Sequence, residues 1–412
     1  SKQILFFKFI FVLVNNKAQN NLRDTFSFYY IFFDLMNYLM RAVDKIFDSN
    51  DARCISRNKL PRLIYDFIEG ATGREVAPIE NLKAFDEIKL LPRALRDVSK
   101  CNTSTVFLGQ TFGLPFGIAP MGMCNLAFSK ADTIMAKAAK KWNLPHGIST
   151  ASSTDLKDLY NICEDNAWFQ LYLFSGVESG MRLVNAAQSV GCKTLILTVD
   201  VPQGSRRMRE LRNGFQVPFK MGLSQFVDLA THPAWTIRTI FNGIPKPVLI
   251  NQSEDRFDRK APRPGATWEF FEKIRMIWKG RIIVKGVLST EDAVRVKELG
   301  ADAIWVSNHG GRQLDAAPPA IKVLPRIREA LGNEYPLAFD SGIRDGSDIV
   351  KALANGANFV FLGRPILHSL AVAGDIGLEK ILSILTEDIK VVMAQLGINR
   401  IEEINSSVLA GE

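Results

Sequence analysis

The chain has 412 residues, of which 47% are hydrophobic and 23% charged, a composition typical of a globular protein large enough to bury a sizeable core. Its net charge of +8 suits an anionic partner, but the sequence contains no block of Lys and Arg like those that bind nucleic acids, so we expect no nucleic-acid partner. The five cysteines are scattered without a CxxC motif, which argues against disulfide or zinc frameworks and favours a cytoplasmic location.

Two apolar, aromatic-rich runs open the chain, at residues 4–14 and 26–39. The first is well short of the roughly 20 residues that a membrane span needs. A signal peptide is the alternative interpretation, although no small-residue cleavage site follows the first run. We interpret residues 1–45 as a leader, with the protein proper starting near Met36 or Met40, and assign residues 46–412 to one domain.

From about residue 115 the chain repeats one unit, a short apolar strand followed by a polar turn and an amphipathic helix. We expect eight strands, at residues 116–120, 146–150, 168–173, 194–200, 282–286, 303–308, 337–342 and 359–364. Helices are predicted between them, among others at residues 129–142, 178–190, 291–299 and 346–355.

This alternation predicts an α/β protein with a closed (β/α)8 TIM barrel. A doubly wound open sheet is the alternative. That fold would need a glycine-rich phosphate turn after the first strand, and residues 120–123 (PMGM) do not provide one.

Groups suited to a ligand stand at the carboxyl end of every predicted strand, which is the face where barrel enzymes build their sites. In chain order they are Pro120, Ser149, Gln170 with Tyr172, Thr198 with Asp200, Lys285, Ser307 with His309, Asp340 with Gly342 and Arg344, and Gly363 with Arg364. A single one of these groups is easily explained as a strand-end cap, but eight sets at the same end of the predicted barrel indicate a common site.

The connection between strands four and five is an exception to this alternation, because residues 201–281 are far longer than an ordinary turn. Residues 268–279 are predicted to be helical, and an insertion of about 203–265 precedes them. It carries several aromatic side chains, among them Phe215, Phe219, Phe226, Trp235 and Phe241, interspersed with Lys and Arg. Such a segment suits peripheral contact with an anionic membrane surface; an active-site lid and a subunit contact are the alternatives.

The loop at residues 307–315 (SNHGGRQLD) combines a base with a fixed positive charge. His309 is one of only four histidines, and Arg312 stands three residues later, with Gly310 and Gly311 between them to allow a close approach to a ligand. The alternative is a polar turn whose histidine caps a helix.

Other groups at the strand ends could act together with His309 in catalysis. Asp200 is placed to steady a protonated His309, and Tyr172 offers a hydroxyl to a substrate oxygen. Arg207 and Arg312 supply the planar forks that suit a carboxylate. Together they indicate oxidation of a carbon that bears both a hydroxyl and a carboxylate. No side chain accepts two electrons, so the reaction requires a redox cofactor.

Residues 340–344 (DSGIR) and Gly363 with Arg364 follow strands seven and eight, where barrels commonly hold a phosphate. Lys285 is expected across the mouth, where its charge would stabilise a reduced flavin ring. The alternative for Lys285 is an ion pair with a neighbouring carboxylate.

Over roughly residues 58–404 the chain resembles the FMN-dependent α-hydroxy-acid oxidase/dehydrogenase family, which includes glycolate oxidase, L-lactate dehydrogenase and mandelate dehydrogenase. The motifs that carry the resemblance are SNHGGRQLD at 307–315, TVDVP at 198–202 followed by Arg206 and Arg207, FQLY at 169–172, VKG at 284–286, DSGIR at 340–344 and FLGRP at 361–365. A chance match to all of them in order is very improbable.

The resemblance implies roles for individual residues. His309 removes a proton with the support of Asp200, Arg207 and Arg312 bind the substrate carboxylate, and Tyr172 contacts the hydroxyl or keto oxygen. FMN is the implied cofactor. Its implied contacts are Pro120, Met121 and Gly122; Ser149, Gln170, Thr198 and Lys285 at the ring; and Ser307, Asp340, Gly342, Arg344, Gly363 and Arg364 at the ribityl chain and phosphate. Whether the α-carbon loses hydrogen as a proton or a hydride is left open.

Two residues depart from the family pattern. Phe67, in the substrate site, stands where glycolate oxidase-like members usually carry a tyrosine that helps to hold the carboxylate. Tyr65 does not replace it, because its side chain points elsewhere if this segment is helical. Ala151 stands where some members carry a bulky aromatic residue. We therefore expect a roomier, more apolar pocket, for an (S)-2-hydroxy acid that is L-lactate-like or bulkier rather than glycolate.

The insertion at 203–265 has a counterpart in membrane-associated bacterial members, where it anchors the enzyme beside a quinone pool. The resemblance implies a dehydrogenase, peripheral on the inner face of the cell membrane, that passes electrons to a quinone-type acceptor. An oxidase that uses O2 and makes hydrogen peroxide is the alternative. Tetramers are common among relatives, so we also expect a homo-oligomer.

Overall fold

The structure, a computed structural model, describes residues 41–174, 176–216, 222–248 and 265–411. Eight parallel strands close into a barrel in chain order, with β10 pairing back onto β3. The strands are β3 (Phe116–Met121), β4 (His146–Ser149), β5 (Ala167–Leu171), β6 (Thr194–Thr198), β7 (Arg281–Val287), β8 (Ala303–Val306), β9 (Leu337–Phe339) and β10 (Phe359–Leu362). The predicted TIM barrel is confirmed and the open sheet is wrong.

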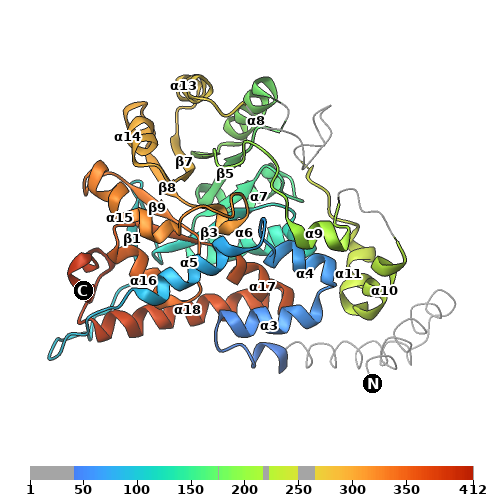
Figure 1. Cartoon of the computed structure of the whole chain (residues 1–412), viewed down its shortest axis with the longest axis horizontal. Coiled ribbons are helices and arrows are strands. Elements are labelled where there is room, and N and C mark those ends of the chain that lie inside the picture. Colours follow the sequence, from blue (N-terminus) through green and yellow to red (C-terminus); the bar gives the residue numbers. More distant parts are fainter. Residues whose placement is uncertain (1–40, 175, 217–221, 249–264, 412) are drawn as a thin grey trace.

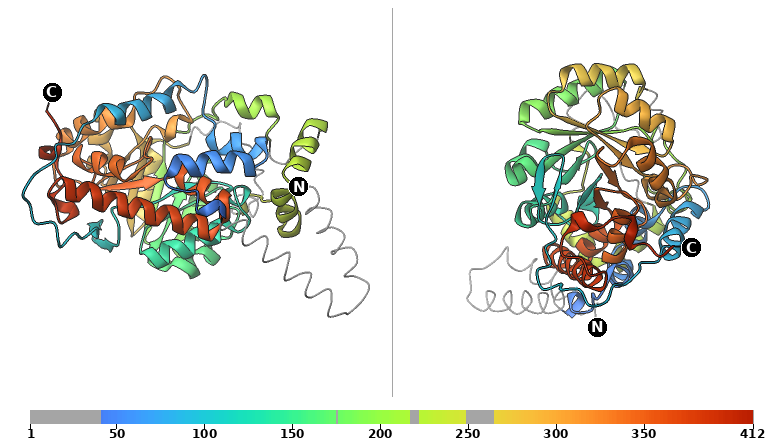
Figure 2. Two further views of the ribbon diagram at one scale, coloured as in Figure 1. Left: turned by 90° about the horizontal axis from the view of Figure 1, so that it is seen from below. Right: turned by 90° about the vertical axis from the view of Figure 1, so that its left-hand side faces the viewer.

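Helices surround the strands, as the right-hand view of Figure 2 shows. The outer helices are α6 (Ala131–Trp142), α7 (Leu156–Cys163), α8 (Val177–Val190), α13 (Trp268–Ile277), α14 (Thr290–Glu298), α15 (Ala320–Leu331), α16 (Gly346–Ala354) and α17 (Arg364–Ala373), with α18 (Asp375–Gln395) packed on α16 and α17. Because each strand has the barrel interior on one side and helices on the other, its sequence is a continuous apolar run rather than an alternating one.

Aromatic side chains fill the barrel interior. Trp305 stacks on Phe361 with ring centroids 3.8 Å apart, and Trp168 packs against Phe361 at 5.7 Å. The hairpin of β1 (Thr105–Phe107) and β2 (Gln110–Phe112) closes one end, where Phe107 stacks on Phe359 at 5.1 Å. The interior is therefore a packed core, which leaves the carboxyl ends of the strands for a site.

Several strands end earlier than predicted. The strand expected to reach residue 342 ends at Phe339, because Ser341 (φ 88°) and Gly342 (φ 105°) adopt left-handed conformations that cannot continue a ladder. The strand expected to reach residue 308 likewise ends at Val306. The functional groups therefore lie on loops just beyond the strands rather than within them.

The described part of the chain before the barrel includes the helices α3 (Ser49–Lys59), α4 (Arg62–Glu69) and α5 (Val76–Glu87). The carboxylate of Asp315, in the loop after β8, accepts hydrogen bonds from the backbone N–H groups of Arg74, Val76 and Ala77 at 2.7–3.1 Å and so fastens the start of α5. Residues 1–40 lie outside the described part of the chain, so the leader stays a prediction.

The insertion after β6 begins with α9 (Met208–Asn213), α10 (Leu223–Thr231) and α11 (Pro233–Asn242). These helices lie at one end of the molecule beside α4, as Figures 1 and 2 show. The helix predicted at 268–279 is α13, which ends at Ile277. Phe219 and residues 249–264 of the predicted insertion lie outside the described residues.

Candidate active site

A cavity of about 440 Å³ opens at the carboxyl ends of the strands. The predicted site residues that line it are Phe67, Pro120, Met121, Gly122, Ser149, Tyr172, Arg207, Lys285, His309, Arg312, Asp340, Gly342, Arg344, Gly363 and Arg364. Four others, Asp200, Gln170, Thr198 and Ser307, lie behind this lining and hydrogen-bond to its residues or to one another. The structure thus brings the whole predicted set to one place.

His309 lies between an acid and a phenol. Its Nδ1 is 2.9 Å from Oδ1 of Asp200, and its Nε2 is 3.3 Å from the Tyr172 hydroxyl. The residue adopts a left-handed conformation (φ 58°), which is unusual for a residue with a side chain. Its backbone N–H donates to the Ser307 hydroxyl at 2.9 Å, which helps to hold this strained turn.

Asp200 depends on a glycine beside it. A Cβ at Gly286 would lie 2.5 Å from the Asp200 carboxyl carbon, so only glycine leaves room for this carboxylate. One oxygen, Oδ2, is buried without a hydrogen-bond partner among the described residues.

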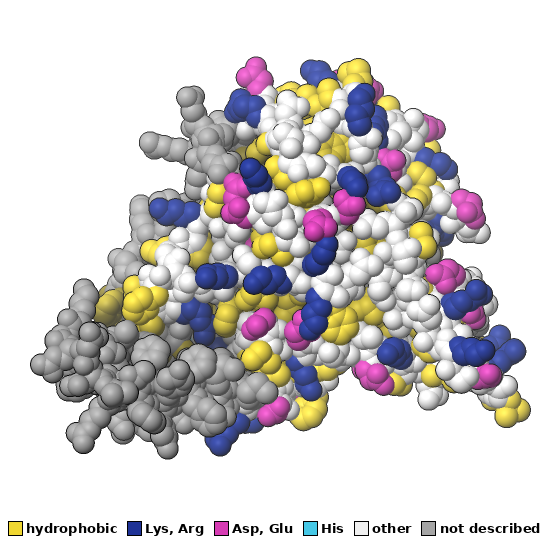
Figure 3. All heavy atoms as spheres, turned by 180° about the vertical axis from the view of Figure 1, so that it is seen from behind, with side chains coloured by type: hydrophobic (Ala, Val, Ile, Leu, Met, Phe, Trp, Pro, Cys, Tyr) yellow, Lys and Arg dark blue, Asp and Glu magenta, His cyan; other side chains and the backbone are white. Residues whose placement is uncertain are grey.

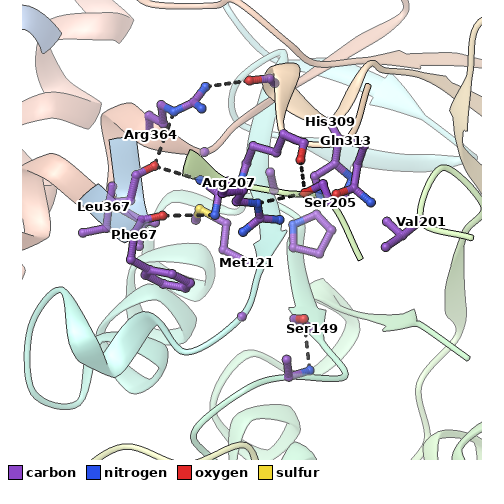
Figure 4. A pocket seen from close by; sticks show the side chains of 18 of the residues that line it. Phe67, Met121, Ser149, Val201, Ser205, Arg207, His309, Gln313, Arg364 and Leu367 are labelled. Atoms are coloured by element: carbon purple, nitrogen blue, oxygen red, sulfur yellow. Dashed lines mark hydrogen bonds between the residues drawn. The ribbon is translucent and has the colours of Figure 1, made fainter. Parts of the chain in front are cut away.

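The two arginines of the predicted carboxylate clamp share a carboxylate, Glu210, which is 5% exposed. Nη1 of Arg207 lies 3.3 Å from Oε1 of Glu210, and Nη2 of Arg312 lies 3.8 Å from the same atom. The Ser205 hydroxyl accepts from Nε of Arg207 and donates to the backbone carbonyl of Arg312. Figure 4 shows Arg207 beside Ser205 and His309 in the cavity.

Arg312 is also held by the carboxyl end of α4. Its guanidinium donates to the backbone carbonyls of Phe67 at 3.0 Å, Ile68 at 3.2 Å and Gly70 at 2.7 Å. A helix C-terminus carries partial negative charge, so this is a favourable place for a cation. The arginine is therefore fixed before any ligand arrives.

Lys285 does form the ion pair that the sequence offered as its alternative role. Its Nζ donates to Asp340 at 2.5 Å and to the Ser307 hydroxyl at 2.8 Å, while also lining the cavity. Burial alone would raise the pKa of Asp340, but the Lys285 ammonium and the hydroxyls of Ser307 and Ser341 outweigh burial and lower it. Asp340 is therefore an anion that orients the lysine.

The donors and acceptors at the inner end of the cavity fit a flavin ring. The side-chain oxygen of Gln170 is buried without a hydrogen-bond partner among the described residues, while its amide nitrogen donates to Thr198 at 3.0 Å. An orphaned buried acceptor of this kind suits a ring N–H group. Lys285 adds a cation, which suits negative charge on the reduced ring.

Arg344 and Arg364 fit a phosphate. Burial, together with the like charge of Arg364, lowers the pKa of Arg344 to about 10, and burial also lowers the pKa of Arg364. Two guanidinium groups that repel each other in a partly buried place suit a bound dianion. The family resemblance predicts the FMN phosphate there.

Apolar side chains form the outer part of the cavity. The ring of Phe67 stacks on Phe215 with centroids 4.7 Å apart, and the Arg312 guanidinium lies 5.7 Å from the Phe67 centroid. Ala151 also lines the cavity, and a Cβ at Gly122 would lie 2.8 Å from the Ala151 methyl group. Tyr65 instead lies on α4 with its ring 5.7 Å from that of His368, as its helical position predicts.

Sequence reasoning missed several polar residues at or beside this site, among them Glu210 and Ser205, which line the cavity, and Glu69, which does not line it but interacts with Arg364 and Arg344. Glu210 stands three residues after Arg207, a spacing that pairs side chains on a helix, so the signal was present. Burial would raise the pKa of Glu69, but the hydrogen bond from His368 and the charges of Arg364 and Arg344 lower it to about 2. No sequence spacing indicates that cluster, whose members lie on α4 and on segments about three hundred residues later.

Comparison with known proteins identifies the family. A family model described as FMN-dependent dehydrogenase matches residues 56–411. The chain is 36% identical over 355 residues to a 2-hydroxyacid oxidase of Dictyostelium discoideum, covering 86% of this chain and 87% of that protein. It is 34% identical over 374 residues to the (S)-mandelate dehydrogenase of Pseudomonas putida, covering 89% and 94%. A crystal structure of the monotopic membrane protein (S)-mandelate dehydrogenase has a TM-score of 0.83 at 34% identity, covering 89% of this chain and 100% of that one.

Proposed function

Because the chain belongs to the FMN-dependent dehydrogenase family, an FMN-dependent enzyme of 2-hydroxy-acid oxidation, we propose that it oxidises an (S)-2-hydroxy acid with a bulky apolar side chain to the 2-oxo acid. The observation that carries this proposal is the cavity in which His309, backed by Asp200, faces the arginine pair Arg207 and Arg312. A base beside two guanidinium forks suits a hydroxyl next to a carboxylate.

In this proposal, Arg207 and Arg312 bind the substrate carboxylate and so fix the neighbouring carbon against His309. The Tyr172 hydroxyl, 3.3 Å from Nε2 of His309, bonds the substrate oxygen. His309 accepts one proton from the substrate at Nε2, and Asp200 stabilises the resulting imidazolium through Nδ1. The apolar walls of the cavity exclude water, which strengthens the electrostatic interactions among these charged groups.

FMN, when bound, supplies the two-electron acceptor that no side chain provides. Gln170, Thr198, Ser149 and Lys285 would hold its ring, and the predicted contacts to the ribityl chain and phosphate include Arg344 and Arg364. The ion pair with Asp340 fixes the position of Nζ of Lys285, which also lines the cavity.

The substrate side chain is proposed to lie against Phe67 and Ala151. Phenylalanine offers the carboxylate no hydroxyl at position 67, and its stack on Phe215 presents an apolar surface instead. Alanine at 151 leaves room that a bulky residue would fill. Both features favour an aromatic or branched substrate over glycolate.

We further propose that α10 and α11 contact an anionic membrane and that the electrons pass to a quinone-type acceptor. Several of their apolar side chains are exposed, among them Leu223 (81%), Phe226 (62%), Ile240 (70%) and Phe241 (68%). Within the described part of the chain, no helix combines the length and apolarity needed to cross a bilayer. We propose that this contact is peripheral. A related mandelate dehydrogenase structure is described as monotopic.

One face of the molecule carries charges of both signs. On the face seen in Figure 3, Lys and Arg side chains are interspersed with Asp and Glu. A mixed surface of this kind offers no continuous basic track to nucleic acid. Assembly into a homo-oligomer remains a prediction that sedimentation of the purified protein tests.

One experiment tests the activity and the acceptor together. Purified protein with FMN is mixed anaerobically with glycolate, L-lactate, (S)-mandelate and a medium-chain 2-hydroxy acid, and the bleaching of the flavin is followed. Turnover is then measured with a short-chain quinone and with O2, assaying hydrogen peroxide. We expect fastest bleaching with mandelate or the medium-chain acid and faster reoxidation by the quinone. Fastest bleaching with glycolate would contradict the proposed substrate class. Rapid peroxide formation would contradict the proposed quinone-type acceptor.

A further inference from the structure

Helix α4 receives its amino-terminal cap from the insertion rather than from its own sequence. Its N-cap residue is Pro61, whose side chain makes no capping hydrogen bond. Instead, the carboxylate of Asp228 on α10 accepts hydrogen bonds from the backbone N–H groups of Arg62 at 3.0 Å and Leu63 at 3.1 Å. It thus satisfies two of the amide groups that a helix leaves unpaired in its first turn, and its charge suits the helix dipole.

The opposite end of the same helix holds two cations of the active site. The carbonyl oxygens of Ile68 and Gly70 accept from Arg312 at 3.2 and 2.7 Å and from Arg364 at 3.4 Å each. The Phe67 carbonyl adds a third bond to Arg312. The last turn of α4 therefore helps to orient both guanidinium groups, although the shortest hydrogen bond of Arg364, 3.0 Å, goes to the Gly310 carbonyl.

The helix between these two ends is short. It has eight residues, which is about two turns, and an isolated helix of that length is unstable in water. Its middle is tied to the insertion as well, because Asp66 accepts a hydrogen bond from Asn213 at 3.1 Å and lies 3.7 Å from Arg209. The first and last turns of α4 are therefore adjacent, so we expect a change at the first turn to reach the last.

We propose that Asp228 is a positioning residue of the active site, which acts through α4 on the orientation of Arg312 and Arg364. The part that concerns Arg312 rests on the proposed function, in which Arg312 binds the substrate carboxylate. The part that concerns Arg364 rests only on its place at the predicted phosphate site. Asp228 itself does not line the cavity, and its side chain also lies 3.4 Å from His232 on the same segment.

The test compares D228A and D228N with a matched control, S289A. Ser289 caps α14 by accepting from the backbone N–H of Asp292 at 3.2 Å, and no residue of α14 lines the cavity. S289A therefore removes a side-chain helix cap at a helix that does not line the cavity. Each holoenzyme is assayed for KM and kcat with a 2-hydroxy acid and an artificial acceptor, for the FMN dissociation constant, and for deuterium uptake at residues 61–70.

We expect D228A to raise KM and the FMN dissociation constant by about five-fold, which is the size of effect that the loss of one helix cap produces. The kcat should stay within about two-fold of the wild-type value. Deuterium uptake at residues 61–70 should rise. D228N should be intermediate, because an amide keeps one acceptor oxygen, and it carries the test if D228A does not fold. S289A should change none of these values.

Wild-type KM and FMN affinity in D228A would overturn the proposal, as would equal changes in S289A. The readouts also separate this proposal from the function that it builds on. If the wild-type protein oxidises no 2-hydroxy acid, the proposed function fails, while FMN affinity and deuterium uptake still decide whether Asp228 acts through α4.

Discussion

Nδ1 of His309 lies 2.9 Å from Oδ1 of Asp200, a residue 109 positions earlier in the chain. The carboxylate can only accept in this hydrogen bond, so Nδ1–H is the donor and, in the neutral imidazole, Nε2 carries the lone pair. Nε2 is also the nitrogen that faces Tyr172 in the cavity. The pair thus selects the imidazole tautomer that the proposed chemistry needs.

Asp200→Asn should lower the rate of flavin reduction by about 10²–10⁴-fold, because an amide can donate to Nδ1 and so favour the tautomer that carries its proton on Nε2. Stopped-flow measurement of flavin bleaching under anaerobic substrate checks this. The absorbance of bound FMN should stay unchanged, and exposed Asp97→Asn serves as the control. A rate within three-fold of the wild type would show that Asp200 has no such role.

The barrel was predictable from the sequence because its strands are apolar runs of regular spacing, and the site was predictable because the polar residues follow those runs. His309 and Arg312 stand out in this way. The exact strand ends were not predictable, since the left-handed turn at Ser341 and Gly342 gives no sequence signal that separates strand from loop. Contacts between distant segments, such as Asp228 with the start of α4, were also invisible, because they depend on how the insertion packs.

Phe67→Tyr should lower KM for glycolate and L-lactate by about two- to ten-fold, as one added hydrogen bond to the carboxylate predicts, with little change in kcat. Steady-state kinetics on both substrates measures this. Phe215→Tyr is the matched control, because it adds a hydroxyl to the other ring of the stacked pair. A rise in KM for both substrates would mean that position 67 does not face the carboxylate.

Ala151→Leu should shrink the space proposed for the substrate side chain. We expect kcat/KM for (S)-mandelate to fall at least about ten-fold relative to that for glycolate, because overpacking penalises only the bulkier ligand. Val106→Leu, at an exposed position on β1 at the closed end of the barrel, controls for added volume. Equal losses on both substrates would indicate a general distortion rather than a size filter.

Glu69→Gln should make the unfolding free energy fall less steeply as the pH is lowered. The pKa of Glu69 is lowered to about 2 from an ordinary 4.5, so its carboxylate contributes stability that is fully present above pH 4.5 and is lost as the pH falls toward 2. The difference corresponds to about 3 kcal/mol of unfolding free energy. Urea unfolding of both proteins at pH 5 and pH 3, with equal FMN, measures it.

The wild type should lose more unfolding free energy than the variant between these two pH values. Burial raises the pKa of Asp132 and of Asp348 to about 6, which acts in the opposite sense, but both carboxyls are present in each protein and cancel in the comparison. Parallel pH dependence in the two proteins would contradict the assignment to Glu69.

Phe226→Ser with Phe241→Ser should weaken binding to anionic vesicles. The two side chains are 62% and 68% exposed on α10 and α11, and burying aromatic surface in a bilayer interface contributes about 2 kcal/mol per residue. Cosedimentation with vesicles should therefore fall at least about ten-fold, while turnover with a soluble artificial acceptor stays unchanged. Leu95→Ser, at a fully exposed leucine between α5 and β1, is the control, because it removes an exposed apolar side chain elsewhere on the surface. If the double variant binds as the wild type does, α10 and α11 are not the membrane contact, and if the wild type itself binds no vesicles, the proposed membrane contact is wrong.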